Sequence, residues 1–269
     1  DRRAPQIAFN LIIRGAGGYY DPADHFGLAQ FTAAMLREGT ATRSSQQIAE
    51  QIDRMAAMLN AGSGLSAQDA SISAGCLTEY LDQALDLAAD ILLNPAFPEQ
   101  ELARYKTQTR AGLTQQRAQA GFLAMERYSQ VMSGDHPSGR VSPTVAALDK
   151  TTRESLVAFH KAHYVPDFAI IAISGDISMS EAMKKVQARF GSWPKAGVAA
   201  PAVADPAPLA KPGVFLVSRP NSVQTNLMVG TQGIKRTDPD YYQLTMLNKI
   251  VGGGPTGRLF RHLREDKGY

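Results

Sequence analysis

The chain has 269 residues, of which 44% are hydrophobic, enough to bury the core of one domain and part of another. Its 28 Lys and Arg are interleaved with 25 Asp and Glu, giving a formal net charge of +3 without a basic run, so we expect no nucleic-acid partner. No apolar run approaches the roughly 20 residues that span a bilayer, and the single cysteine, Cys76, excludes an internal disulfide and a cysteine-based metal cluster.

The N-terminal part of the chain predicts alternating strands and helices. No charged-then-apolar leader follows Asp1, which is typical of a processed N-terminus. Residues 6–14 are rich in β-branched and apolar residues and meet a glycine-rich turn, so they predict a strand. In residues 44–59, apolar residues recur at three- and four-residue steps behind a capping box of Ser44 and Gln47, which predicts a helix. Further elements are predicted as a strand at 71–76, a helix at 81–93 that ends before Pro95, and a helix with Pro98 in its first turn that runs to about 117.

The middle of the chain continues this mixture of elements. A capping box of Thr151 and Glu154 predicts a helix to about His163, and residues 167–174 predict a buried strand. A second box, Ser178 with Glu181, predicts a helix that ends near Phe190. Strands and helices mixed in this way indicate an α+β or α/β fold.

A Pro- and Ala-rich stretch without periodicity between residues 194 and 212 marks a domain boundary. After it, a strand-like segment at 226–229, a turn with glycine and a helix from 239 to about 251 echo the order of elements at the N-terminus, which suggests a duplicated unit. We therefore predict a first domain at 1–194, a linker at 195–212 and the start of a second domain at 213–269, incomplete here.

The segment QFTAA at residues 30–34 is the most informative of the chain. Taken alone, it would be interpreted as a core helix with small residues at a packing contact. Its flanks, Gly-Leu-Ala before and Met-Leu-Arg-Glu-Gly-Thr after, resemble the active-site helix of the pitrilysin or insulinase family of zinc peptidases, which carries His-x-x-Glu-His. Where the family has the first His, the Glu and the second His, this chain has Gln30, Ala33 and Ala34. Alanine offers no lone pair to zinc, and the Gln30 amide oxygen is a weak ligand.

The resemblance also implies a third ligand, a Glu on a later helix, which would fall within residues 111–116. No Asp, Glu or His occurs between Glu101 and Glu126. We therefore expect no catalytic residue, no metal ligand and no cofactor in this chain.

Further segments resemble the family in the right order, which makes the resemblance more specific than any one of them. They are SGDHPSGR at 133–140, FHKAHYVP at 159–166, a strand ending in Gly-Asp at 175–176, FGSW at 190–193, and GGGPTGRLF at 252–260 with Leu-Arg-Glu at 263–265. The glycine cluster lacks the Gly-Lys-Ser/Thr of a phosphate loop, which disfavours a nucleotide site. The resemblance implies an α+β fold of two homologous units, metallopeptidase-like, each a mostly antiparallel sheet flanked by helices, that enclose a chamber for unfolded peptides.

Arg264 is the one functional position that the resemblance keeps. In the family, an Arg and a Tyr seven residues apart contact the substrate backbone, and both side chains can donate to a peptide carbonyl or its oxyanion. Arg264 matches the Arg, whereas Tyr269 is only five residues further on. The alternative is an ordinary surface Arg on an amphipathic helix.

The remaining histidines allow a second metal hypothesis. His160 and His163 are three residues apart, and Asp24 precedes His25, so a new site is conceivable. We expect them instead to be solvated helix-end and loop residues, and Cys76 to be a small core residue.

These observations lead to three functional hypotheses. The first is a non-catalytic subunit of a heterodimeric zinc peptidase, which binds peptide and completes the chamber of a zinc-bearing homologous partner. The second is a structural or scaffold protein, and the third, less favoured, is an active zinc protease with relocated ligands. By analogy with two-chain bacterial members, we expect a periplasmic or cell-envelope location.

Overall fold

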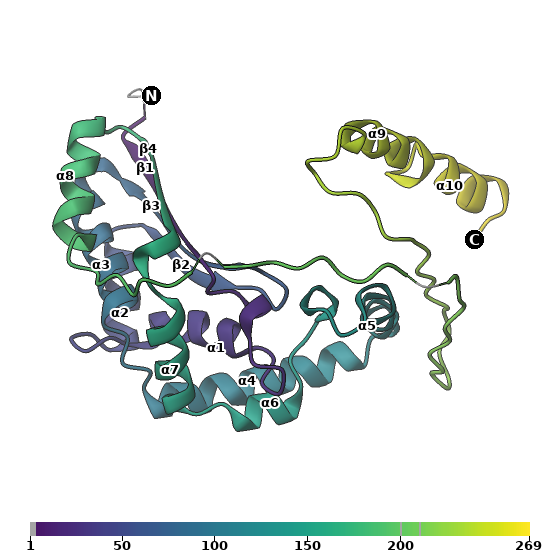
Figure 1. Cartoon of the computed structure of the whole chain (residues 1–269), viewed down its shortest axis with the longest axis horizontal. Helices are drawn as coiled ribbons and strands as arrows, with labels where there is room; N and C mark the ends of the chain where they lie inside the picture. Colours follow the sequence, from purple (N-terminus) through teal and green to yellow (C-terminus); the bar gives the residue numbers. More distant parts are fainter. Residues whose placement is uncertain (1–3, 200, 210) are drawn as a thin grey trace. The chain divides into compact units, whose positions relative to one another are not determined.

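The computed structural model describes residues 4–199, 201–209 and 211–269, drawn along the chain in Figure 1. It divides into two compact units, Asp1–Met228 and Val229–Tyr269, and each is described here by itself. None of the described helices combines the length and apolarity needed to cross a bilayer.

The first unit is built on one antiparallel sheet with the strand order β2-β3-β1-β4. Its strands are β1 Gln6–Arg14, β2 Met58–Ser63, β3 Asp69–Leu77 and β4 Ala169–Gly175. Alternate side chains of the two central strands are buried, so one face of the sheet forms the floor of the core. The predicted strand at 6–14 is confirmed, and the α+β fold with an antiparallel sheet is confirmed in this unit.

Helices complete the core of the first unit. They are α1 Leu28–Met35, α2 Ser45–Arg54, α3 Leu81–Leu93, α4 Glu99–Arg117, α5 Ala120–Ser133, α6 Val145–Lys150, α7 Arg153–His163 and α8 Met179–Phe190. α1 and α3 pack against the sheet, and α3 also contacts α8, which Figure 1 shows beside it. Lys185 and Arg189 on α8 form ion pairs with Asp82, and Arg189 also reaches Asp86, both on α3.

Several helix predictions are confirmed and one is too long. The helix at 81–93 has the predicted bounds, and Ser44 forms the predicted capping box with Gln47. α2, however, ends at Arg54 rather than at residue 59. Ala56 has a φ of +45°, which turns the chain, and Leu59 belongs to β2, a strand that the sequence analysis missed. Leu59 continued the helical spacing of apolar residues, but it reaches the core from a strand.

Two predicted helix starts were wrong by one residue. α7 is capped by Thr152, whose hydroxyl accepts from the Ser155 N–H in a capping box, whereas Thr151 is buried before the helix. Pro98 is the N-cap of α4 and lies just outside its first turn. α8 begins as predicted, because the Ser178 side chain accepts from the Glu181 N–H.

The predicted buried strand at 167–174 is wrong in its start and its burial. Residues 166–168 form a 3₁₀ turn, so β4 begins at Ala169. It is an edge strand whose side chains alternate between half-buried and exposed, with Ile170 52% exposed. A continuous apolar run suggested burial on both faces, but here one face is open.

The second unit contains α9 Tyr241–Gly252, α10 Arg258–Phe260 and a π-helix at Arg261–Asp266. Within the described part of this unit no residue lies in a strand, and residues 226–229, which the echo predicts as a strand, pair with no other strand. The predicted domain boundaries at 194 and 213 stay a prediction.

Phe9 tests the packing between sheet and helices. Its ring is buried on β1 and stacks on Phe190 of α8 at 5.9 Å between centroids. We expect Phe9→Ala to lower the free energy of unfolding by about 3–5 kcal/mol, because it leaves a cavity in the core. Urea denaturation measures this loss, and Ile170→Ala on the open face serves as control with a change below about 1 kcal/mol. Equal losses in the two variants would contradict this core.

Candidate functional site

The loop before α1 holds the N-terminus of this helix. Gly27 is its N-cap with a φ of +102°, and a Cβ there would lie 2.9 Å from that of Pro143, so only glycine suits the position. The buried carboxylate of Asp21 accepts the N–H of Gly27 and the N–H of Ala29, both at 2.7 Å. A side chain six residues upstream therefore caps α1.

Arg140 braces the same loop from another part of the chain. Its guanidinium donates to the Gly18 carbonyl at 2.9 Å and lies 4.1 Å from the centre of the Phe26 ring. Burial raises the pKa of Asp21 to about 6, although the two backbone hydrogen bonds and the charge of Arg140 act in the opposite direction. A single Asp in a glycine- and aromatic-rich loop carries no motif, so the role of Asp21 was not predicted from the sequence.

The helices α1 and α4, which in the family carry the ligands, are held together without any metal ligand. The rings of Phe31 on α1 and Tyr105 on α4 meet edge to face at 6.0 Å between centroids. Arg104 of α4 pairs with Glu38 just after α1 and with Glu101 on its own helix. The scaffold of a two-helix site is thus present.

The side chains at the motif positions do not fit a zinc ion. Ala33 is 1% exposed, and Ala34 is half-buried; both present methyl groups where ligands would be needed. Gln30 is half-buried, and its Oε1 is shielded from solvent and has no hydrogen-bond partner. No group of three His, Cys, Asp or Glu side chains among the described residues is arranged to hold a metal ion. The donor set at this position is one amide oxygen, and that is too little for a stable site.

Of the histidines that suggested a second site, His25 is buried and His160 and His163 are half-buried with hydrogen-bond partners in the protein, so the expectation of solvated side chains is wrong. His25 bonds the Thr151 hydroxyl at 2.8 Å, His160 donates to the Leu92 carbonyl at 2.7 Å, and His163 donates to the Gly15 carbonyl at 2.7 Å. Burial lowers the pKa of all three. Each ring therefore acts as a neutral hydrogen-bonding link between elements, whereas Cys76 is a buried core thiol as expected.

Arg264 lies in the π-helix of the second unit. Its side chain is exposed, with the guanidinium 6.0 Å from the centre of the Phe260 ring. Its contact with substrate stays a prediction.

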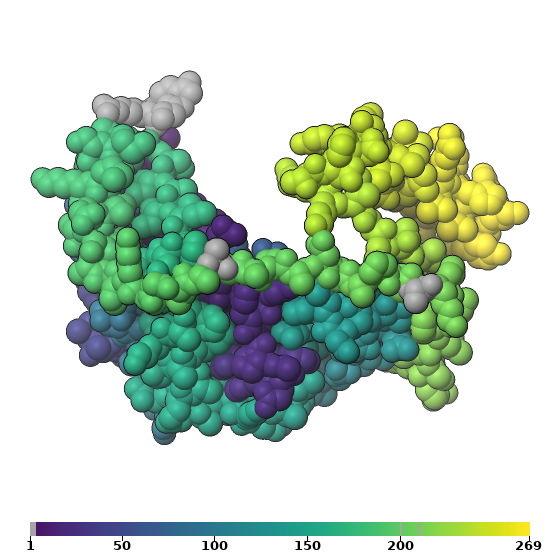
Figure 2. All heavy atoms as spheres, in the orientation of Figure 1, coloured from purple at the N-terminus to yellow at the C-terminus, as the bar shows by residue number. Residues whose placement is uncertain are grey.

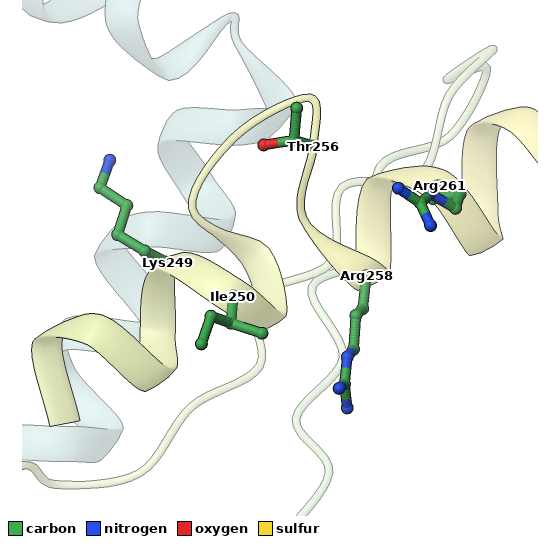
Figure 3. Close-up of a pocket in the computed structure, with 5 residues that line it drawn as sticks. All are labelled: Lys249, Ile250, Thr256, Arg258 and Arg261. Atoms are coloured by element: carbon green, nitrogen blue, oxygen red, sulfur yellow. The ribbon is translucent and has the colours of Figure 1, made fainter. Parts of the chain in front are cut away.

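A shallow hollow next to the glycine cluster of the same unit is lined by Lys249, Ile250, Thr256, Arg258 and Arg261. In Figure 3 the three cationic side chains point away from one another, so they do not converge on one anion.

The two halves of the chain each match a known family model. The model of insulinase, peptidase family M16, matches residues 2–140, which include α1 and α4. The chain belongs to peptidase family M16. The model of the peptidase M16 inactive domain matches residues 150–269, a range that contains neither of these helices. The loss of ligands therefore lies in the half that matches the insulinase model.

Similar proteins support the same family. An uncharacterized zinc protease of Bacillus subtilis, YmxG, is 29% identical over 97% of this chain and 62% of its own length. One from Rickettsia bellii is 27% identical over the same shares. The chain thus spans less than two thirds of these relatives.

Solved structures agree on the fold. A crystal structure of a peptidase M16 inactive domain from Pseudomonas fluorescens matches all of this chain and 64% of its own, with a TM-score of 0.82 and 29% identity. Pitrilysin matches 77% of this chain and 22% of its own with a TM-score of 0.66, and at 20% identity it supports the fold alone.

The cap on α1 can be tested by removing its carboxylate. We expect Asp21→Ala to lower the free energy of unfolding by about 2–3 kcal/mol, because the Gly27 and Ala29 N–H groups lose their acceptors in a buried loop. Chemical denaturation at pH 7 measures the change. Asp24→Ala, three residues away at an exposed ion pair with Lys150, is the control and should leave stability close to that of the wild type. A loss no larger than that of the control would contradict the cap.

The partly or fully desolvated rings of His25, His160 and His163 predict a loss of stability in acid. Because their folded pKa values lie below the unfolded value of about 6.5, the unfolded chain takes up protons first as the pH falls below that value. Their contribution is therefore present above about pH 6.5 and is lost below it. Asp21, with its raised pKa, acts in the opposite direction between about pH 4 and 6, so the test compares variants.

We expect His160→Gln, whose amide can still donate to the Leu92 carbonyl, to lose less stability than the wild type between pH 7.5 and 5.5 in urea denaturation. His262→Gln, at an exposed position, should follow the wild type. Parallel curves for wild type and His160→Gln would refute the contribution of this ring.

Proposed function

We propose that this chain is a non-catalytic member of peptidase family M16 that works with a zinc-bearing homologous subunit. In this proposal it binds unfolded peptide and completes the chamber in which the partner cleaves it. The observation that carries the proposal is the contrast at α1, where a well-packed helix stands at the motif position and the donor atoms for a metal are absent.

The residues at the three motif positions are better suited to form the wall of a peptide-binding chamber than to bind a metal. Ala33 packs in the core and Ala34 is small, so the helix needs no metal to stay folded. Gln30 keeps an amide whose oxygen lacks a partner, and amides can pair with the backbone of a peptide. Arg264, an exposed cation with five donors, is proposed to contact the peptide carbonyl in the partner's site.

Mixing experiments with the catalytic homologue test this proposal. Adding the wild-type protein should raise peptidase activity above that of the partner alone, while the protein by itself has none. We expect Arg264→Ala to reduce the gain on the order of tenfold or more, because a charged donor to the transition state is lost. Arg261→Ala, three residues away on the same π-helix, should keep the gain. Absence of any gain from the wild type, or an equal gain from both variants, would sink the proposal.

The main alternative is a scaffold protein with a peptidase-like fold. Binding of a fluorescent unfolded peptide to the protein alone distinguishes the two hypotheses. The proposed subunit should bind the peptide, whereas a scaffold need not. An active zinc protease with relocated ligands is separated by metal analysis of the purified protein, which should contain less than one zinc per ten chains. The periplasmic or cell-envelope location remains part of the proposal by analogy with two-chain bacterial members.

A further inference from the structure

Three aromatic side chains form a shelf on the first unit that no part of the proposed function uses. The aromatic shelf consists of Tyr19 and Tyr20, in the 3₁₀ turn after β1, and His136. The Tyr19 ring meets the Tyr20 ring at 5.1 Å and the His136 ring at 5.4 Å between centroids, both edge to face. Because the residues come from segments 116 positions apart, the fold and not local sequence assembles this shelf.

The predicted linker lies on this shelf and is bound through its backbone. The Ala204 N–H donates to the Tyr19 hydroxyl at 2.9 Å, and the Ala204 carbonyl accepts from His136 Nε2 at 3.0 Å. The Tyr20 hydroxyl donates to the Ala202 carbonyl at 3.5 Å. Figure 2 shows this green segment running across the face of the first unit. The shelf thus binds backbone groups of Ala202 and Ala204, two residues apart, as receptors for extended peptides do.

The hydrogen bond from Ser138 determines which ring nitrogen of His136 accepts and which donates. The Ser138 N–H donates to His136 Nδ1 at 3.2 Å, so this nitrogen is the acceptor of the neutral ring. The proton of the neutral ring then lies on Nε2, the atom that faces the Ala204 carbonyl. Donor and acceptor are therefore matched at both backbone groups of Ala204.

Other contacts hold the segment before it reaches the shelf. The Asp167 carboxylate accepts the N–H groups of Ala196 and Gly197 at 2.9 and 2.7 Å, and these bonds lower its pKa. Before them, Trp193 Nε1 donates to the Tyr164 carbonyl at 3.1 Å. The stretch from 193 to 204 is attached at three places.

The composition of the segment suits this mode of binding. Pro201 and Pro206 fix their own φ angles, and Pro206 also keeps Asp205 out of the helical region, which favours an extended segment before it docks. Less conformational entropy is then lost on docking than for a flexible linker. A Pro- and Ala-rich sequence is typical of an unstructured spacer, but it also suits a site that binds backbone N–H and carbonyl groups rather than side chains.

We propose that the aromatic shelf is a receptor for the chain's own segment 201–206, and that residues 193–199 and 201–204 act as a docked strap of the first unit instead of a free linker. The strap reaches α1 through covalent neighbours, since Tyr20 precedes Asp21, whose carboxylate caps this helix. Docking of the strap and placement of α1 are coupled through one loop. This inference does not rest on the proposed peptidase partner.

Hydrogen exchange and proteolysis of the full chain test the strap. We expect the Ala204 amide to exchange on the order of tenfold or more slower than in a free peptide of the same sequence, because two hydrogen bonds hold this residue. In the double variant Tyr19→Phe with His136→Ala, exchange and elastase cleavage within 196–204 should rise on the order of tenfold, because the two hydrogen bonds to Ala204 are lost. The matched control Tyr242→Phe removes an exposed hydroxyl elsewhere and should leave both rates unchanged.

The amides of β1 report whether the fold survives, since they belong to the sheet. If they lose protection in the double variant, Tyr19→Phe alone, which keeps the ring, decides the question by the exchange of the Ala204 amide. An Ala204 amide in the wild type that exchanges as fast as in the free peptide would overturn the strap. So would exchange and cleavage within 196–204 that stay at wild-type rates in a variant whose β1 amides remain protected.

Discussion

The placement of α1 depends on one buried carboxylate. Asp21 binds the Gly27 and Ala29 N–H groups, which have no partner inside the helix, and does so where solvent is excluded. Desolvation disfavours the charged form of Asp21. The two backbone hydrogen bonds, together with the positive charge of nearby Arg140, offset part of that penalty. This cap thus holds the first turn of α1, in which Gln30 lies, while contacts with α7 and β2 hold the rest of the helix.

The structure separates the scaffold of a peptidase site from its chemistry. α1 and α4 are joined by the Phe31–Tyr105 ring contact and the Glu38–Arg104 ion pair, neither of which involves a metal. Metal ligands must be polar and desolvated, which destabilises a helix unless the ion is bound. Ala33 in the core carries no such penalty. Loss of the donor set is therefore compatible with an intact fold, and a family likeness in the fold does not imply zinc chemistry.

Local patterns predicted those elements whose stability is local. β1 is rich in β-branched and apolar residues, α3 is largely apolar and ends before Pro95, and the Ser178 cap lies next to its helix, so each was found. The failures involve partners far along the chain. Leu59 continues a helical spacing yet pairs in β2 with β3, and half-buried His160 donates to the Leu92 carbonyl, 68 residues away. At the site, the absence of ligands could be read directly from residues 30–34, whereas the Asp21 cap requires the folded loop.

The linker illustrates the same difference between composition and context. Proline, alanine and missing periodicity describe what a segment does not form by itself, namely helix or strand. They leave open whether its backbone groups find partners elsewhere. Ala204 finds them in Tyr19 and His136, residues from two distant turns that only the fold brings together. An extended segment stiffened by proline presents its N–H and carbonyl groups to side chains and loses little conformational entropy when it docks. The features that exclude regular structure here therefore favour docking.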